Sequence, residues 1–100
     1  MRKIMYCEKR DGQRVLFEKV RIVNAIYKAF EASQEGNKII AQKMTETIME
    51  NILRIHRDGT PTIEDIQDLV EDTLISHNFR ATAKKYILYR EERAKMRLIS

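Results

Sequence analysis

Cysteine is nearly absent from this sequence of 100 residues, which contains only Cys7. A single cysteine excludes an internal disulfide, and Cys7 shows no recognisable metal-ligand spacing with His56 or His77. We therefore expect no metal site built from protein side chains. Long apolar runs are also lacking, since none approaches the roughly 20 residues needed to cross a bilayer. The first residues lack the extended apolar stretch of a secretory signal, so we expect a cytoplasmic protein.

Glycine is scarce as well, with only Gly12, Gly36 and Gly59. Neither of the common glycine-rich phosphate loops, Gly-x4-Gly-Lys-Ser/Thr and Gly-x-Gly-x-x-Gly, can be written with them. Any nucleotide site must therefore take its phosphate-binding groups from side-chain cations and helix N-termini. No nucleophile pairs with either histidine, and the acidic residues fall on a predicted solvent face. The sequence indicates a binding domain without an active site.

Charge is modest in sum but uneven along the chain. The 19 Lys and Arg and 15 Asp and Glu residues give a formal net charge of +4. An acidic segment precedes a basic one, and their residues are Glu64, Asp65, Asp68, Glu71 and Asp72, then Arg80, Lys84, Lys85, Arg90, Arg93, Lys95 and Arg97. The basic end can meet phosphate groups, a nucleic acid or simply the acidic segment.

Residues 7–17 predict a β-hairpin that carries two adjacent cations. Asp11-Gly12 is typical of a two-residue turn with positive φ, which places Lys9 and Arg10 on the hairpin. The second strand runs directly into a helix N-terminus, where Lys19 adds a third cation and unpaired N–H groups attract anions. The segment is thus a plausible polyphosphate grip. The alternative is an ordinary hairpin tip with solvated charges.

Apolar periodicity predicts four helices after the hairpin. We expect a first helix over residues 18–32 that is covered on most sides, and a second over 38–56. Between them, Gly36 suits a left-handed C-terminal cap and Asn37 can cap the next helix. A capping box at residues 62–65 starts the third helix, and the fourth spans about 79–98. The predicted fold is α+β, a short hairpin, possibly extended by a third strand, against a four-helix cluster.

The order of these segments resembles the ATP-cone family. The hairpin with Lys9 and Arg10, the first helix from Lys19, the third from Thr62 and the fourth around residues 83–93 follow one another as in that family, and the resemblance covers about residues 4–97. It implies one domain over residues 1–100 that binds ATP or dATP, with Mg²⁺, as an allosteric effector. ATP-cones are best known at the N-terminus of ribonucleotide reductases. We therefore expect an N-terminal fragment of a longer protein, and residues 86–93 look most similar to those of an anaerobic ribonucleoside-triphosphate reductase.

Transferred residue by residue, the resemblance implies nucleotide contacts from four segments. These candidates are Cys7, Lys9, Arg10, Lys19, Thr62, Ile63, Ile66, Gln67, Tyr86, Arg90 and Arg93. The hairpin cations and Lys19 match phosphate-binding positions, whereas Cys7 and Tyr86 match positions near adenine. The residues around Thr62 lie near base and sugar in the family, and Arg93 can reach phosphate or a second nucleotide.

Several of these residues also have an ordinary structural interpretation. Cys7 suits a plain strand position, and Thr62 suits a helix N-cap. Tyr86 can pack in the core with Arg90 extended over it. Some relatives carry histidine in place of Gln67, and a glutamine hydrogen-bonds but does not titrate.

The resemblance makes the chain a regulator whose partners are adenine nucleotides and the catalytic domain of its parent protein, or other copies of itself in a nucleotide-dependent oligomer. One alternative is the nucleotide-sensing domain of a transcriptional repressor, although the four-cysteine zinc ribbon of that family is absent. A second is a small basic nucleic-acid-binding domain, against which the interleaved Glu91 and Glu92 count. A third is an interaction module that binds neither ligand.

Overall fold

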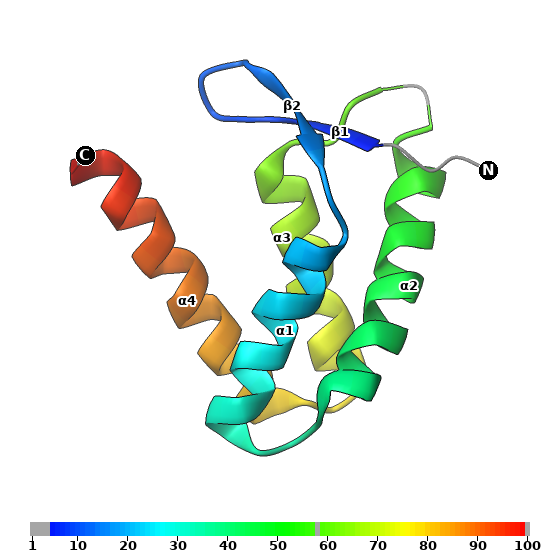
Figure 1. Cartoon of the computed structure of the whole chain (residues 1–100), viewed down its shortest axis with the longest axis vertical. Helices are drawn as coiled ribbons and strands as arrows, with labels where there is room; N and C mark the ends of the chain where they lie inside the picture. The colour runs from blue at the N-terminus through cyan, green and yellow to red at the C-terminus, as the bar shows by residue number, and fades with distance from the viewer. Residues whose placement is uncertain (1–4, 58, 100) are drawn as a thin grey trace.

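The computed structural model describes residues 5–57 and 59–99 and contains a hairpin followed by four helices. The elements are β1 (Met5–Glu8), β2 (Arg14–Phe17), α1 (Val20–Ser33), α2 (Lys38–Ile55), α3 (Ile63–Ser76) and α4 (Arg80–Ile99). The hairpin lies across one end of the helices, and α4 leans away from α1 and α3 toward its C-terminus (Figure 1). This arrangement confirms the predicted α+β class. No helix in the described ranges is long and apolar enough to cross a membrane.

The hairpin loop is one residue longer than the sequence predicts. Strand pairing ends at Glu8 and Arg14, and the Lys9 amide then donates to the Gln13 carbonyl at 2.8 Å. Residues 10–12 form the loop, and Gly12 has a φ of 86°. Three-residue hairpin loops commonly place a glycine in this left-handed conformation at their third position. The predicted two-residue turn is therefore wrong, although the need for glycine at this point is confirmed.

The connection between α1 and α2 also differs from the prediction. Gln34, not Gly36, adopts the left-handed conformation after α1, with a φ of 63°. Gly36 is required for another reason: a Cβ built there would lie 2.7 Å from Cζ of Phe30, whose ring is fully buried. Asn37 caps α2 as predicted, because its Oδ1 accepts from the Ile40 amide at 2.9 Å.

The predicted capping box at the start of α3 is confirmed. The Asp65 amide donates to Thr62 Oγ1, and the Thr62 amide donates to Asp65 Oδ2, both at 3.0 Å. The residues before α3 also reach the hairpin, since the Glu8 amide donates to the Pro61 carbonyl at 2.9 Å. An isolated parallel bridge pairs Glu8 with Thr62. In the described ranges this bridge takes the place of the suggested third strand.

The hydrophobic core lies between the four helices and under the hairpin. Its fully buried side chains include Phe30, Ile26, Ile48, Ile52, Leu74, Val70 and Cys7. The prediction that α1 is covered on most sides is wrong at its first turn, where Val20 is half exposed. Val20 borders an open groove between α1 and α2 instead of the core.

The start of α4 is held by a carboxylate from the α1–α2 connection. Glu35 Oε1 accepts from the backbone amide of Thr82 at 2.8 Å and from its hydroxyl at 2.6 Å. The Thr82 hydroxyl lies a further 2.6 Å from that of Ser33. These hydrogen bonds lower the pKa of Glu35, that from the Thr82 side chain most. They fix the end of α4 at which it meets α1.

Candidate functional site

Two adjoining chambers lie between the hairpin, α1, α3 and α4. We call them the inner chamber, of about 120 Å³, and the outer chamber, of about 540 Å³. Four residues line both and form their common rim: Phe17, Arg21, Ile63 and Arg93. The outer chamber falls in the size range of small-molecule sites. The two together form a cleft that runs from the helices to the hairpin loop.

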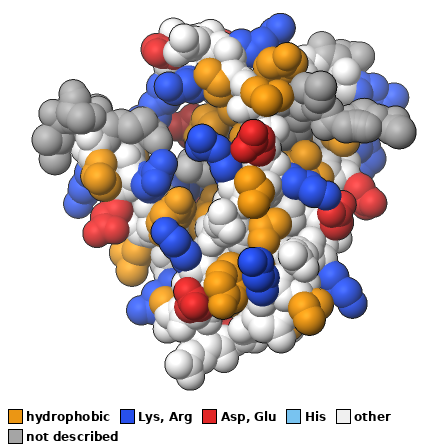
Figure 2. Space-filling model, viewed as in Figure 1, with side chains coloured by type: hydrophobic (Ala, Val, Ile, Leu, Met, Phe, Trp, Pro, Cys, Tyr) orange, Lys and Arg blue, Asp and Glu red, His pale blue; other side chains and the backbone are white. Residues whose placement is uncertain are grey.

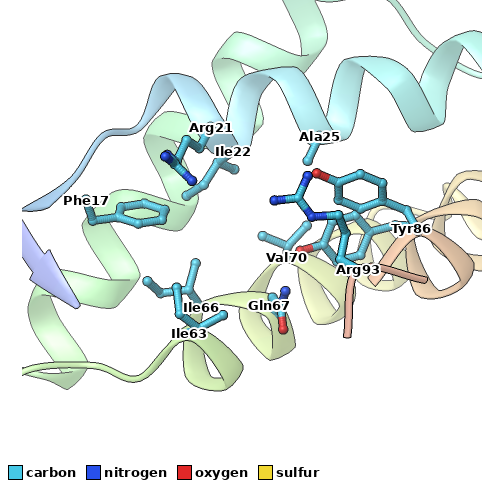
Figure 3. A pocket seen from close by; sticks show the side chains of 11 residues that line it. Phe17, Arg21, Ile22, Ala25, Ile63, Ile66, Gln67, Val70, Tyr86 and Arg93 are labelled. Atoms are coloured by element: carbon cyan, nitrogen blue, oxygen red, sulfur yellow. The ribbon is translucent and has the colours of Figure 1, made fainter. Parts of the chain in front are cut away.

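The inner chamber has apolar and aromatic walls. Figure 3 shows Phe17 at one side, Tyr86 and Arg93 of α4 at the other, and Ile63, Ile66 and Gln67 of α3 below. Tyr89 of α4 also lines this chamber, and its ring centroid lies 6.1 Å from that of Tyr86. Flat hydrophobic faces with one amide among them suit an aromatic base that also needs a hydrogen bond.

Tyr86 is almost completely buried, with a relative exposure of 4%. Burial raises the pKa of its hydroxyl above the ordinary value, and the charge of nearby Arg90 opposes this only in part. Its hydroxyl is therefore neutral at physiological pH. Tyr86 thus packs in the hydrophobic core, which was one of its two predicted roles. It also borders the inner chamber, where it can contact a ligand. The two roles are compatible.

Four cations line the outer chamber, against one acidic residue, Asp11. Arg10 comes from the hairpin loop and Lys9 from the position before it, and Arg21 and Arg93 lie at the rim shared with the inner chamber. In Figure 2, several Lys and Arg side chains lie around the hollow between α4 and the hairpin, with acidic and hydrophobic side chains among them. Such a cluster favours a ligand with several negative charges.

Cys7 forms part of the apolar wall of the outer chamber and is 1% exposed. Burial raises the pKa of its thiol, and the charges of Arg21 and Lys9 offset part of that rise. A thiol with a raised pKa is a poor nucleophile, so Cys7 serves here as a small apolar side chain. Cys7 is therefore both a buried strand residue and part of a chamber wall. Its placement fits an ordinary structural role as well as a contact with a nucleotide.

Most of the sequence-predicted site residues gather around the two chambers. Those that line them are Cys7, Lys9, Arg10, Ile63, Ile66, Gln67, Tyr86 and Arg93. Thr62 does not line either chamber, and its side chain is occupied as the N-cap of α3. The geometry therefore supports the interpretation of Thr62 as a helix N-cap.

Lys19 lies apart from this cluster. Its Nζ lies 2.5 Å from Oε2 of Glu46 on α2, and it borders a separate groove between α1 and α2. Successive residues of a helix are about 100° apart, so Lys19 and Arg21 point to nearly opposite sides of α1. Of the two cations at this helix start, Arg21 lines both chambers and Lys19 lines neither. Arg21 lies four residues before Ala25, another inner-chamber residue, and this spacing is the signal that could have identified it.

Arg90 also lines neither chamber. Its guanidinium pairs with Asp68 Oδ1 at 2.9 Å and with Glu71 Oε2 at 2.5 Å, and its side chain is 20% exposed. Arg90, which belongs to the basic segment, is therefore paired with the acidic segment on α3. Sequence analysis also missed Phe17 and Tyr89 as chamber residues, since aromatic residues at such spacing are equally expected in a core.

The described residues bring no three His, Cys, Asp or Glu side chains together in an arrangement that could hold a metal ion. The cleft instead offers apolar walls and cations. Its geometry is that of a binding site for an organic anion.

Comparison with known proteins agrees with this geometry. The family model described as the ATP cone domain matches residues 5–95. A vitamin B12-dependent ribonucleoside-diphosphate reductase of Thermoplasma acidophilum is 39% identical over 94 residues, which cover 89% of this chain and 12% of that protein. An anaerobic ribonucleoside-triphosphate reductase of Haemophilus influenzae is 36% identical over 85 residues, covering 85% of this chain and 12% of that protein.

A third relative is a ribonucleoside-diphosphate reductase subunit alpha of Chlamydia pneumoniae, 35% identical over 96 residues, with 89% of this chain and 9% of that protein covered. The chain thus spans about a tenth of the length of these relatives. The match over nearly all of the described residues shows that the chain belongs to the ATP cone family of regulatory, adenine-nucleotide-binding domains.

Proposed function

We propose that this chain is the allosteric domain of a ribonucleotide reductase and that ATP and dATP compete for the cleft formed by the two chambers. The observation that carries the proposal is the direct connection of an aromatic, apolar inner chamber to a cationic outer chamber. The ribonucleotide reductases among the relatives supply the class of the parent protein. The Haemophilus relative supports an anaerobic ribonucleoside-triphosphate reductase as one candidate for the parent protein.

The base and the phosphates of a nucleotide would occupy different parts of this cleft. Adenine lies in or at the mouth of the inner chamber, against the side chains of Ile63 and Ile66 and within reach of the Gln67 amide. An amide both donates and accepts, which matches the alternating donor and acceptor edge of adenine. Tyr86 and Tyr89 supply the aromatic wall on the α4 side.

The phosphates extend from the rim into the outer chamber. Arg21 and Arg93 at the rim meet the phosphates nearest the ribose, and Lys9 and Arg10 at the end of the hairpin meet those farthest from it. Mg²⁺ would enter with the nucleotide, because this ion commonly binds to substrate phosphates and retains several waters. No carboxylate cluster of the protein is needed for it.

Regulation requires that the two nucleotides favour different arrangements of the parent protein. ATP and dATP differ only in the 2′-hydroxyl, and a ligand that binds two states equally shifts neither. The domain would therefore act through the surfaces by which it contacts the catalytic body or other subunits. Phosphate contacts provide affinity, and the environment of the ribose decides which state is favoured.

Thermal unfolding with different nucleotides tests this proposal. ATP and dATP at about 100 times their dissociation constants should each stabilise the chain by about 2.7 kcal/mol. GTP and CTP at the same concentrations are the controls and should produce much smaller increases in Tm. Equal increases with all four nucleotides, or no increase with the adenine nucleotides, would contradict adenine-specific binding.

A further inference from the structure

One of the four cations of the outer chamber already has a carboxylate partner. Arg10 Nε lies 2.8 Å from Oε2 of Glu64, in the first turn of α3. Within the described part of the chain, the other three cations, Lys9, Arg21 and Arg93, form no such ion pair. The pair joins the hairpin loop to α3, and its Arg10 lines the outer chamber whereas its Glu64 lines neither chamber.

The position of Arg10 indicates which part of a ligand it would meet. The inner chamber opens into the outer chamber at the rim, and Lys9 and Arg10 line the outer chamber alone. A nucleotide with its base at the inner chamber therefore brings its terminal phosphates, not its α-phosphate, to the hairpin loop. The Nε–H group of Arg10 can turn to those phosphates only when it is released from Glu64.

We propose that Glu64 competes with the terminal phosphates for Arg10 and thereby sets how strongly the site prefers a triphosphate over a monophosphate. This inference rests on the proposed function. The carboxylate weakens the binding of every ligand that must displace it, and only a ligand with several phosphates places enough negative charge at the loop to do so. Glu64 is a specificity-determining residue that acts through Arg10.

The energetics of the pair allow this exchange. The side chains of Arg10 and Glu64 are 55% and 38% exposed, so water already screens their attraction and the pair is easily opened. Glu64 keeps favourable surroundings after release, because a carboxylate in the first turn of a helix interacts with its positive end. The guanidinium gains a charge-assisted, bidentate contact with phosphate in exchange.

Glu64→Gln tests the competition, since it removes the charge and keeps the shape. Calorimetry should show ATP binding about two- to fivefold tighter to this variant than to the natural chain, with AMP affinity nearly unchanged. Asp72→Asn is the matched control, because Asp72 is an exposed carboxylate farther along the same helix. It removes the same charge but not the pair, and should leave the affinity for ATP close to that of the natural chain.

A double-mutant cycle separates the pair from a general charge effect. In an Arg10→Ala background, Glu64→Gln should no longer strengthen ATP binding. A gain that persists without Arg10, an equal gain from Asp72→Asn, or equal gains for ATP and AMP would each overturn the inference. Should Glu64→Gln lower the thermal stability of the chain, Glu64→Ala provides the same loss of charge for the same comparison.

The experiment also distinguishes this inference from the function on which it rests. If the natural chain binds ATP and Glu64→Gln binds it no more tightly, only the competition between Glu64 and phosphate fails. If the natural chain binds no adenine nucleotide, the proposed function fails and this inference with it.

Discussion

At the start of α1, two cations that are two positions apart face different surfaces. Arg21 borders both chambers, whereas Lys19 pairs with Glu46 beside the α1–α2 groove. A phosphate in the outer chamber therefore meets the Arg21 side of the helix. The chemistry of the two side chains is similar, so their directions decide their roles.

We expect Arg21→Ala to weaken ATP binding about ten- to a hundredfold, the equivalent of about 1.5–3 kcal/mol for a charge-assisted contact. Lys19→Ala should leave the affinity nearly unchanged, because it removes only an exposed ion pair. Isothermal titration calorimetry with ATP on both variants provides the measurement. Weaker binding by Lys19→Ala alone would place the phosphates on the other side of α1.

The residues that the sequence predicted correctly depend on their immediate neighbours. Asn37 and the pair Thr62 and Asp65 bind backbone amides within three positions, so local sequence determines them. Gly36 depends on the buried ring of Phe30, and this contact exists only after the helices have packed. The role of Arg21 likewise depends on where α4 and the hairpin lie.

Among the elements, α3 and α4 are joined by an ion pair network centred on Arg90. Its guanidinium binds Asp68 and Glu71 on α3 while its side chain is only one-fifth exposed. Burial lowers the pKa of Arg90, but hydrogen bonds with Glu71 and Asp68 and the charges of these carboxylates together raise it above the ordinary value. This network fixes α4 beside α3 and so positions the α4 wall of the cleft.

Arg90→Ala should therefore lower the free energy of unfolding by about 1–3 kcal/mol, because it leaves two carboxylates without their partner. Arg93→Ala, one turn further along α4, should have little effect on stability and should weaken ATP binding instead. Urea unfolding and calorimetry on the two variants measure both quantities. Comparable effects of the two substitutions on stability would argue against a distinct structural role for Arg90.

The start of α4 is held by hydrogen bonds from Thr82 to the carboxylate of Glu35. Its pKa is lowered in the folded chain, so the folded state binds fewer protons than the unfolded state near the ordinary glutamate pKa of about 4.3. Stability from this carboxylate is fully present above that pH and is lost as the pH falls through the lowered pKa.

Glu35→Gln should thus have a lower Tm than the natural chain at pH 7, and the difference should shrink as the pH falls below about 4. Glu31→Gln is the matched control, because Glu31 is exposed on α1 four residues earlier. Thermal unfolding followed by circular dichroism between pH 3 and pH 7 measures the difference. A difference that does not change with pH would show that the ionised form of Glu35 does not stabilise the start of α4.

The helices themselves were largely predictable, since each predicted helix overlaps an observed one and the observed bounds differ by a residue or two. Apolar periodicity identifies the buried face of a helix but does not give the angle at which helices cross. The lean of α4 away from α1 therefore could not be derived, and the cleft beside α4 depends on it (Figure 1). The family resemblance named eight of the residues that line the chambers but missed Arg21, Phe17 and Tyr89, and periodicity named none of them as site residues.

At the scale of the whole molecule, α1 connects two surfaces. One side carries Arg21 and Ile22 at the chambers, and the other borders the α1–α2 groove through Val20 and Val23. A change in how α1 sits against α4 on nucleotide binding would therefore also alter the outer face of the domain. Coupling between distant sites requires such an element with two arrangements, each favoured by a different ligand.

We expect the identity of the nucleotide to change the assembly of the proposed parent reductase. Coupling of about 1–3 kcal/mol corresponds to a 5- to 150-fold change in association, and it must be reciprocal. Whichever assembly dATP favours should therefore bind dATP more tightly than the dissociated protein does.

Light scattering over a range of protein concentrations, with ATP or dATP, measures the oligomers of this chain and then of the full-length protein. Arg21→Ala in the full-length protein is the control, because it should remove the difference between the nucleotides while leaving the nucleotide-free assembly unchanged. Equal distributions and equal reductase activities with ATP and dATP would contradict regulation. They would leave a domain that binds adenine nucleotides without conveying which one is bound.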